Sequence, residues 1–183
     1  EEHQVTVDNQ THMLPAPFFV IATQNPNEQV GTYPLPESQL DRFLMRISLG
    51  YPDRASERVL LAGADRRETV AQLEAVMTPP ELNAVQRAVH EVRTTDALLD
   101  YVQALIAATR SGRWFREGLS PRAGIALLRA AKAHALMDAR DYVAPDDVQA
   151  VIVQTVAHRL QPIGAGAGSP AQVQALVKSV ALP

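Results

Sequence analysis

The spacing of hydrophobic positions changes near residue 52 and divides the chain into two parts. In residues 4–14, valines and other apolar residues alternate with polar ones around an Asp-Asn turn signal, which predicts a β-hairpin. A continuous apolar run at residues 18–23 predicts a strand covered on both faces, as in a parallel sheet. Another strand is expected at residues 44–49. A short helix is expected over residues 37–43. The first part is therefore predicted to be α/β.

After residue 52 the apolar positions recur at helical spacing, which predicts an all-α part. Asp53 is placed to cap a helix that Gly63 ends. Five more helices are predicted to begin near Thr78, Thr95, Ser120, Val143 and Pro170. A glycine-rich linker at residues 164–169 precedes the last of them. The predicted domains are residues 1–52, 53–163 and 164–183.

Composition narrows the class of protein. The 183 residues are 46% hydrophobic and 20% charged, as in soluble globular domains, and the chain is long enough to bury a core. A net charge of −3 argues against a nucleic-acid partner, and no apolar stretch is long enough for membrane insertion. The absence of cysteine excludes disulfides and thiolate chemistry and permits a reducing compartment. We expect a cytoplasmic protein.

A polar loop over residues 22–37 follows the apolar run and contains the first candidate site residue, Asn25. Ligands of open α/β sheets bind beyond the carboxyl ends of the strands, where an amide can orient water or contact a phosphate. Asn-Pro is also a common way to begin a turn, and taken alone this is the simpler reading. The position of Asn25 after a buried strand and before an arginine favours a functional role for Asn25.

That arginine, Arg42, lies in the sequence Leu-Asp-Arg-Phe of residues 40–43. A guanidinium suits the charge of a transferring phosphoryl group, and a neighbouring subunit can supply it. The alternative is an ordinary surface pair between Asp41 and Arg42, which would contribute little. Arg46 is a second candidate for either role.

Arg122 is the third candidate, in the first turn of a helix that Ser120 is expected to cap. A helix N-terminus and a guanidinium can face the same anion, whereas the helix dipole slightly disfavours an arginine there without one. Other polar groups are given structural roles. The five histidines lack the spacing of metal ligands. Asp146 and Asp147 are expected to begin a helix. The basic and aromatic residues at 110–116 are expected to form the end of a helix, with the rings of Trp114 and Phe115 packed inward.

Four blocks of sequence resemble the MoxR family of AAA+ ATPases. They are residues 22–26 (ATQNP), 28–37 (EQVGTYPLPE), 39–43 (QLDRF) and 119–123 (LSPRA). The resemblance implies part of an AAA+ α/β core, with a β-hairpin and core strands, followed by an all-α lid domain. It implies that Asn25 is the sensor 1 residue, Arg42 an arginine finger acting on the ATP of a neighbouring subunit, and Arg122 the sensor 2 arginine.

The same resemblance implies a homo-oligomer, expected to be a hexamer, that uses ATP and Mg²⁺ to mature or activate other proteins. Proteins with von Willebrand factor A domains are expected partners. The chain carries no Gly-x-x-x-x-Gly-Lys-Ser/Thr loop and no acidic pair at a strand end. We therefore expect a C-terminal portion cut from a longer ATPase, inactive by itself and without tight nucleotide binding.

Two other functions stay open at this point. One is the ATPase subunit of a magnesium-chelatase-like complex, which shares much of this layout. The other is a helical protein-interaction module without catalytic activity.

Overall fold

The structure is a computed structural model that describes residues 4–24, 35–63, 70, 72–164 and 169–183. Backbone contacts divide the chain into two compact units. The hairpin unit comprises Glu1–Phe18 and Ile47–Ala84, and the helical unit comprises Phe19–Arg46 and Val85–Pro183. Units defined by contacts need not follow domain boundaries, so the boundaries predicted at residues 52 and 163 stay a prediction.

The predicted hairpin is confirmed. Strands β1 (Gln4–Val7) and β2 (Gln10–Met13) pair antiparallel, with Val7 opposite Gln10. The two residues between the strands, Asp8 and Asn9, have φ angles of 50° and 63°. Asp and Asn tolerate this left-handed conformation, and two such residues form the tight turn that matches the twist of a hairpin.

The two core strands predicted at residues 18–23 and 44–49 are not formed within the described chain. Both segments run without a ladder partner among the described residues. The side chains of Phe19, Val20 and Ile21 are 66%, 64% and 78% exposed. A strand is held by hydrogen bonds to its neighbours and by burial of its faces, and the described residues supply neither here.

Helices form where the sequence predicts them between residues 35 and 91. They are α1 (Glu37–Leu40), α2 (Arg54–Leu61) and α4 (Pro79–Glu91). Asp53 caps α2 by accepting the N–H of Ser56 at 2.7 Å, and Gly63 follows the helix with a φ of 82°. Glycine reaches this angle without the steric cost of a side chain, so the predicted cap and stop are both confirmed.

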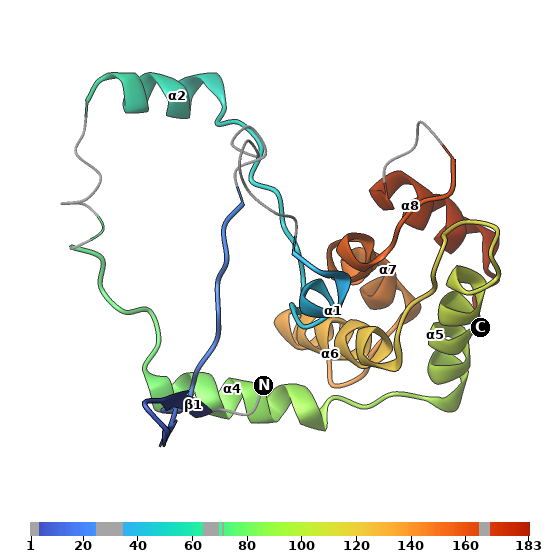
Figure 1. The fold of residues 1–183 in the computed structure, drawn as a ribbon, viewed down its shortest axis with the longest axis horizontal. Helices are drawn as coiled ribbons and strands as arrows, with labels where there is room; N and C mark the ends of the chain where they lie inside the picture. Colours follow the sequence, from blue (N-terminus) through green and yellow to red (C-terminus); the bar gives the residue numbers. More distant parts are fainter. Residues whose placement is uncertain (1–3, 25–34, 64–69, 71, 165–168) are drawn as a thin grey trace. The chain divides into compact units, whose positions relative to one another are not determined.

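Among the described residues after α4, the structure forms four α-helices and one 3₁₀ turn; the helices α5 to α8 can be followed in Figure 1. The elements are α5 (Asp96–Thr109), α6 (Pro121–Met137), α7 (Pro145–Val156), η1 (Ala157–Arg159) and α8 (Ser169–Ser179). The side chains of Thr95 and Ser120 cap α5 and α6 as predicted, accepting N–H groups at 3.2 and 3.1 Å. Of the linker predicted at residues 164–169, residues 165–168 lie outside the described residues, and Ser169 is the first residue of α8.

The core of the helical unit is centred on α6, which packs against α7. Small residues on one face of α6 let the two backbones approach closely: Ala123, Ala131 and Ala135 are fully buried. Phe115, in the loop before α6, is also fully buried, and Trp114 packs against the core. The prediction that these rings pack at a helix end is confirmed. This packing fixes the N-terminus of α6, where the candidate site lies.

Candidate functional site at the N-terminus of α6

The structure places three of the four predicted site residues in the helical unit. Arg122 is the second residue of α6, and its side chain is 48% exposed. Arg42 follows α1 and is exposed. Arg46 is also exposed, and its backbone N–H donates to the carbonyl of Gln154 on α7 at 2.8 Å. Asn25 lies outside the described residues.

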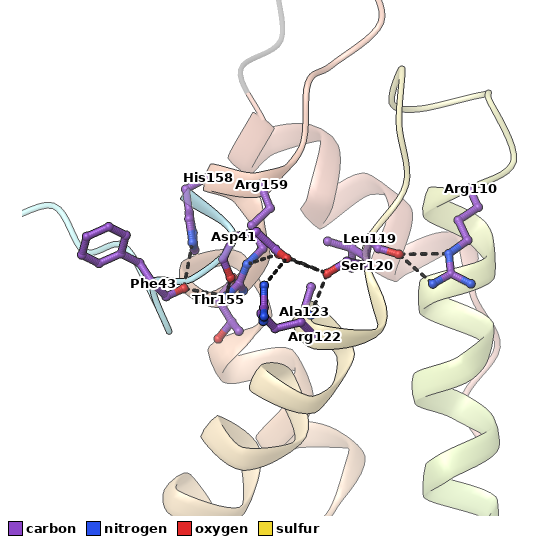
Figure 2. Close-up of polar contacts among 10 residues, drawn as sticks. All are labelled: Asp41, Phe43, Arg110, Leu119, Ser120, Arg122, Ala123, Thr155, His158 and Arg159. Carbon is purple, nitrogen blue, oxygen red and sulfur yellow. Dashed lines mark hydrogen bonds and ion pairs between the residues drawn. The ribbon is translucent and has the colours of Figure 1, made fainter. Parts of the chain in front are cut away.

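The carboxylate of Asp41 joins the segment before Arg42 to the start of α6 (Figure 2). It accepts hydrogen bonds from the hydroxyl of Ser120 at 3.1 and 3.0 Å. It also forms ion pairs with Nε of Arg159 at 3.1 Å and with Nη1 of Arg122 at 3.8 Å. We call Asp41, Ser120, Arg122 and Arg159 the Asp41 cluster. Among the described residues, the ion pairs of Asp41 are with Arg122 and Arg159, and a pair with Arg42 is not seen.

Ser120 serves the helix and Asp41 at once. Its hydroxyl oxygen accepts a hydrogen bond from the N–H of Ala123 at 3.1 Å, which caps α6. The same hydroxyl group donates a hydrogen bond to the carboxylate of Asp41. The N-terminus of a helix carries partial positive charge and stabilises an anion. Asp41 supplies that anion, beside Arg122. The negatively charged carboxylate of Asp41 therefore contacts both the capping hydroxyl of Ser120 and the guanidinium of Arg122 at the start of α6.

Arg110 holds the residue that precedes this cap. Its guanidinium donates two hydrogen bonds to the carbonyl of Leu119, at 3.0 and 2.7 Å (Figure 2). The neighbouring hydroxyl of Thr109 accepts the N–H of Leu119 at 3.1 Å. Arg110 therefore has a structural role at the end of α5, in agreement with the sequence interpretation of the basic-aromatic segment.

Arg159 clamps the backbone on both sides of Arg42. One nitrogen, Nη2, donates to the carbonyls of Asp41 and Phe43 at 3.1 and 2.5 Å, and Nη1 donates to the carbonyl of Thr155. The side chain is only 4% exposed. Burial lowers the pKa of Arg159, and the charge of Asp41 opposes this shift. The clamp fixes the backbone that carries Arg42.

Arg159 and the role of Asp41 were missed by the sequence interpretation. Arg159 lies 118 residues from Asp41, just after α7. A basic residue at a helix C-terminus is common because the dipole favours it, so its position carries no functional signal. Asp41 lies inside the block that resembles the family, and this was the signal that could have drawn attention to it.

His158 lies beside the Asp41 cluster and contacts Phe43. Its Nε2 donates to the carbonyl of Phe43 at 3.3 Å (Figure 2). Burial and then the charge of Arg159 lower the pKa of His158 below its ordinary value of 6.5. The environment therefore favours the neutral form of the imidazole.

This shift predicts a pH dependence of stability. The unfolded chain binds a proton at His158 at a higher pH than the folded chain, so the free energy of unfolding should fall as pH drops below about 6.5. Urea denaturation at pH 7.5 and 5.5 measures this change. The free energy of unfolding should fall less between the two pH values in His158→Gln than in the wild type. The exposed His90→Gln is the control and should keep the wild-type loss. An equal loss in His158→Gln would contradict the prediction.

A second polar cluster lies between α6 and α7. Single ligand atoms of His134, Asp138 and Asp147 lie within 4.8 Å of one another. Both carboxylate oxygens of Asp147 accept hydrogen bonds from Arg140, at 2.6 and 2.5 Å, and one also accepts the N–H of Ala144 at 2.7 Å. This arrangement is a buried ion pair that begins α7, which agrees with the reading of Asp147 as part of a helix start.

Two protein families match the chain. The ATPase family associated with various cellular activities (AAA) matches residues 1–45, and the AAA lid domain matches residues 107–180. Chaperone MoxR1 of Mycobacterium tuberculosis is 38% identical over 169 residues, which cover 87% of this chain and 44% of that protein. The uncharacterized protein YeaC of Bacillus subtilis is 41% identical over 180 residues, covering 98% of this chain and 56% of that protein.

A solved structure agrees with these relatives. The crystal structure of a candidate ATPase from Cytophaga hutchinsonii superposes with a TM-score of 0.88 at 33% identity, and covers 100% of this chain and 59% of that one. The chain belongs to the MoxR family of AAA+ ATPases. For this MoxR-family chain the predicted fold class is confirmed: an AAA+ α/β part followed by a helical lid.

The chain spans about half the length of the curated relatives that it matches. The roles expected for Asn25, Arg42, Arg46 and Arg122 in this MoxR-family chain therefore stay proposals. Within the described part, none of the helices has the length and apolar character needed to cross a membrane.

Proposed function

We propose that the full-length gene product containing this chain is an ATP-driven, chaperone-like ATPase that matures or activates partner proteins. Family membership supports the ATPase activity, and the name of the relative MoxR1 supports the chaperone role. ATP would supply the phosphoryl group that is transferred to water, with Mg²⁺ beside its phosphates. This activity is proposed for the cytoplasm.

The geometry around Arg122 carries this proposal. Its guanidinium lies beside an anionic oxygen at a capped helix N-terminus, 3.8 Å from the carboxylate of Asp41. Phosphate oxygens have the charge and the acceptor geometry to take the same place. Arg122 is proposed to contact the nucleotide of its own subunit, and Asn25 to contact the same nucleotide as sensor 1.

Arg42 is proposed to act on the nucleotide of the neighbouring subunit. Its side chain is exposed, and within the described residues no hydrogen bond or ion pair of its guanidinium is seen, while the backbone on either side is clamped by Arg159. A guanidinium on a fixed backbone suits an arginine finger. We propose a hexameric ring in which Arg42 acts across each interface, with Arg46 as the weaker candidate, and von Willebrand factor A domain proteins as partners.

Nucleotide binding by the full-length gene product tests this function. Arg122→Ala should weaken binding of a fluorescent ATP analogue about tenfold, because a charge-assisted contact to phosphate is lost. Equilibrium titration measures the change, and steady-state hydrolysis should slow in parallel. Arg129→Ala is the matched control, since Arg129 lies exposed two turns along the same helix.

Two results would count against the proposal. Absence of ATP hydrolysis by the full-length gene product would favour a non-catalytic interaction module. Equal analogue affinity in Arg122→Ala and the wild type would remove Arg122 from the nucleotide site.

A further inference from the structure

We propose that Arg159 is a positioning residue for the arginine finger, and that it sets the rate of ATP hydrolysis in the neighbouring subunit without touching the nucleotide. The inference rests on the proposed role of Arg42 as that finger. It starts from the contacts of one guanidinium, which holds the backbone on both sides of Arg42 from a distant part of the chain.

The segment that carries Arg42 has little support of its own. Helix α1, which precedes it, has four residues, and none of them is buried. A single turn of helix is too short to be stable by itself. The N–H of Arg42 donates to the carbonyl of Gln39 at 3.2 Å, and the N–H of Phe43 donates to the carbonyl of Leu40 at 3.1 Å. The carbonyls that follow the helix need partners from elsewhere in the protein.

Arg159 supplies these partners (Figure 2). Its Nη2 donates to the carbonyls of Asp41 and Phe43, and its Nη1 donates to the carbonyl of Thr155 near the end of α7. Its Nε lies 3.1 Å from the carboxylate of Asp41, and the side chain is only 4% exposed. One buried side chain thus ties the segment that carries Arg42 to the end of α7.

The clamp leaves the side chain of Arg42 outside. Arg42 is exposed, whereas Asp41 and Phe43 on either side of it are partly buried. A long side chain reaches a defined point only when its backbone is fixed, and a misplacement of about 1 Å can slow a reaction about a hundredfold. Loss of the clamp should therefore slow phosphoryl transfer and leave the binding of nucleotide unchanged.

Arg159→Lys in the full-length gene product tests the inference. Lysine keeps the positive charge beside Asp41, but its single ammonium group cannot replace a planar group with five N–H donors. We expect kcat for ATP to fall about ten- to a hundredfold, while the affinity for a fluorescent non-hydrolysable ATP analogue stays within about twofold. Arg159→Gln, which keeps a neutral donor, should show the same difference between the two measurements. If both variants lose analogue affinity as much as turnover, Arg159 has a structural role only and the inference is overturned.

A double-mutant cycle shows whether Arg159 acts through Arg42. If the clamp only places the finger, replacing Arg159 should cost nothing more once the finger is gone. Turnover by the double variant Arg42→Ala/Arg159→Lys should therefore equal that of Arg42→Ala alone. A further tenfold loss in the double variant would mean that Arg159 acts by another route, which would overturn the inference.

Arg140→Lys is the matched control. Arg140 is another arginine of the helical unit, and its guanidinium holds the carboxylate of Asp147 at the start of α7. Its replacement loosens the packing of α7 at the end away from Arg159, so kcat should stay within about threefold of the wild type. Equal losses of kcat in Arg140→Lys and Arg159→Lys would indicate a general loosening of the lid and would contradict a positioning role.

The outcomes separate the two proposals. Wild-type turnover in Arg159→Lys beside a large loss in Arg42→Ala would overturn the positioning role alone. Wild-type turnover in Arg42→Ala would overturn the finger role of Arg42 and the positioning role with it.

Discussion

Arg42→Ala is expected to lower ATP turnover by the full-length gene product about a thousandfold, the low end of the range for loss of an arginine finger. ATP affinity should change less than about twofold, since Arg42 would act on the transition state in the neighbouring site and not on the nucleotide of its own subunit. Stability should be unaffected because the side chain is exposed. Steady-state hydrolysis and analogue titration measure the two effects separately.

Mixing variants tests whether Arg42 acts in trans. In a ring of Arg42→Ala and Arg122→Ala subunits, some sites combine an intact Arg122 with an intact Arg42 from the neighbour. Hydrolysis should rise above that of either variant alone, with a maximum near equal amounts. No gain at any ratio, when native mass spectrometry shows mixed rings, would exclude action in trans.

Arg46→Ala is the matched control for Arg42. It removes an exposed arginine four residues away, and the backbone N–H of residue 46 keeps its bond to Gln154. Turnover by Arg46→Ala should stay within about threefold of the wild type if Arg42 is the finger. The reverse pattern would move the role to Arg46, the second candidate.

Asp147→Ala is expected to lower the free energy of unfolding of the 183-residue chain by about 3 kcal/mol, the low end for breaking a buried ion pair. The side chain of Asp147 is completely buried. Its loss takes the acceptor from the N–H of Ala144 and leaves the guanidinium of Arg140 with Asp138 as its remaining carboxylate partner among the described residues. Urea denaturation followed by circular dichroism measures the change.

The neighbouring residue provides the control for Asp147. Asp146 lies in the same first turn of α7 but is exposed, so Asp146→Ala should cost less than about 1 kcal/mol through the helix dipole alone. Similar losses in the two variants would show that the ion pair contributes little.

The pH dependence of the Asp147 contribution is set by its pKa. Hydrogen bonds from Arg140 lower the pKa of Asp147 far below its ordinary value of 3.8. The stabilisation is therefore fully present above about pH 5 and is lost as the pH falls from 3.8 through the lowered pKa. The difference between wild type and Asp147→Ala should be constant from pH 8 to 5 and shrink in stronger acid.

Local signals determined most of the secondary structure. Caps such as Asp53, Thr95 and Ser120 act on the backbone within three residues, so their positions in the sequence are enough to place helix starts. The Asp-Asn turn acts at the same short range. The strands predicted at residues 18–23 and 44–49 did not form, because a strand depends on partners distant in sequence. Apolar character alone does not supply these partners.

The candidate site shows the same division. The sequence by itself determined the family and marked Asn25, Arg42, Arg46 and Arg122, because each lies within or beside a short block of the MoxR type. Only the tertiary structure brought Arg159 to Asp41 and Phe43 across more than 115 residues of chain. An ion pair between distant residues leaves no periodic pattern in either segment. It depends on how α6 and α7 pack, and that packing alone decides which arginine meets which carboxylate.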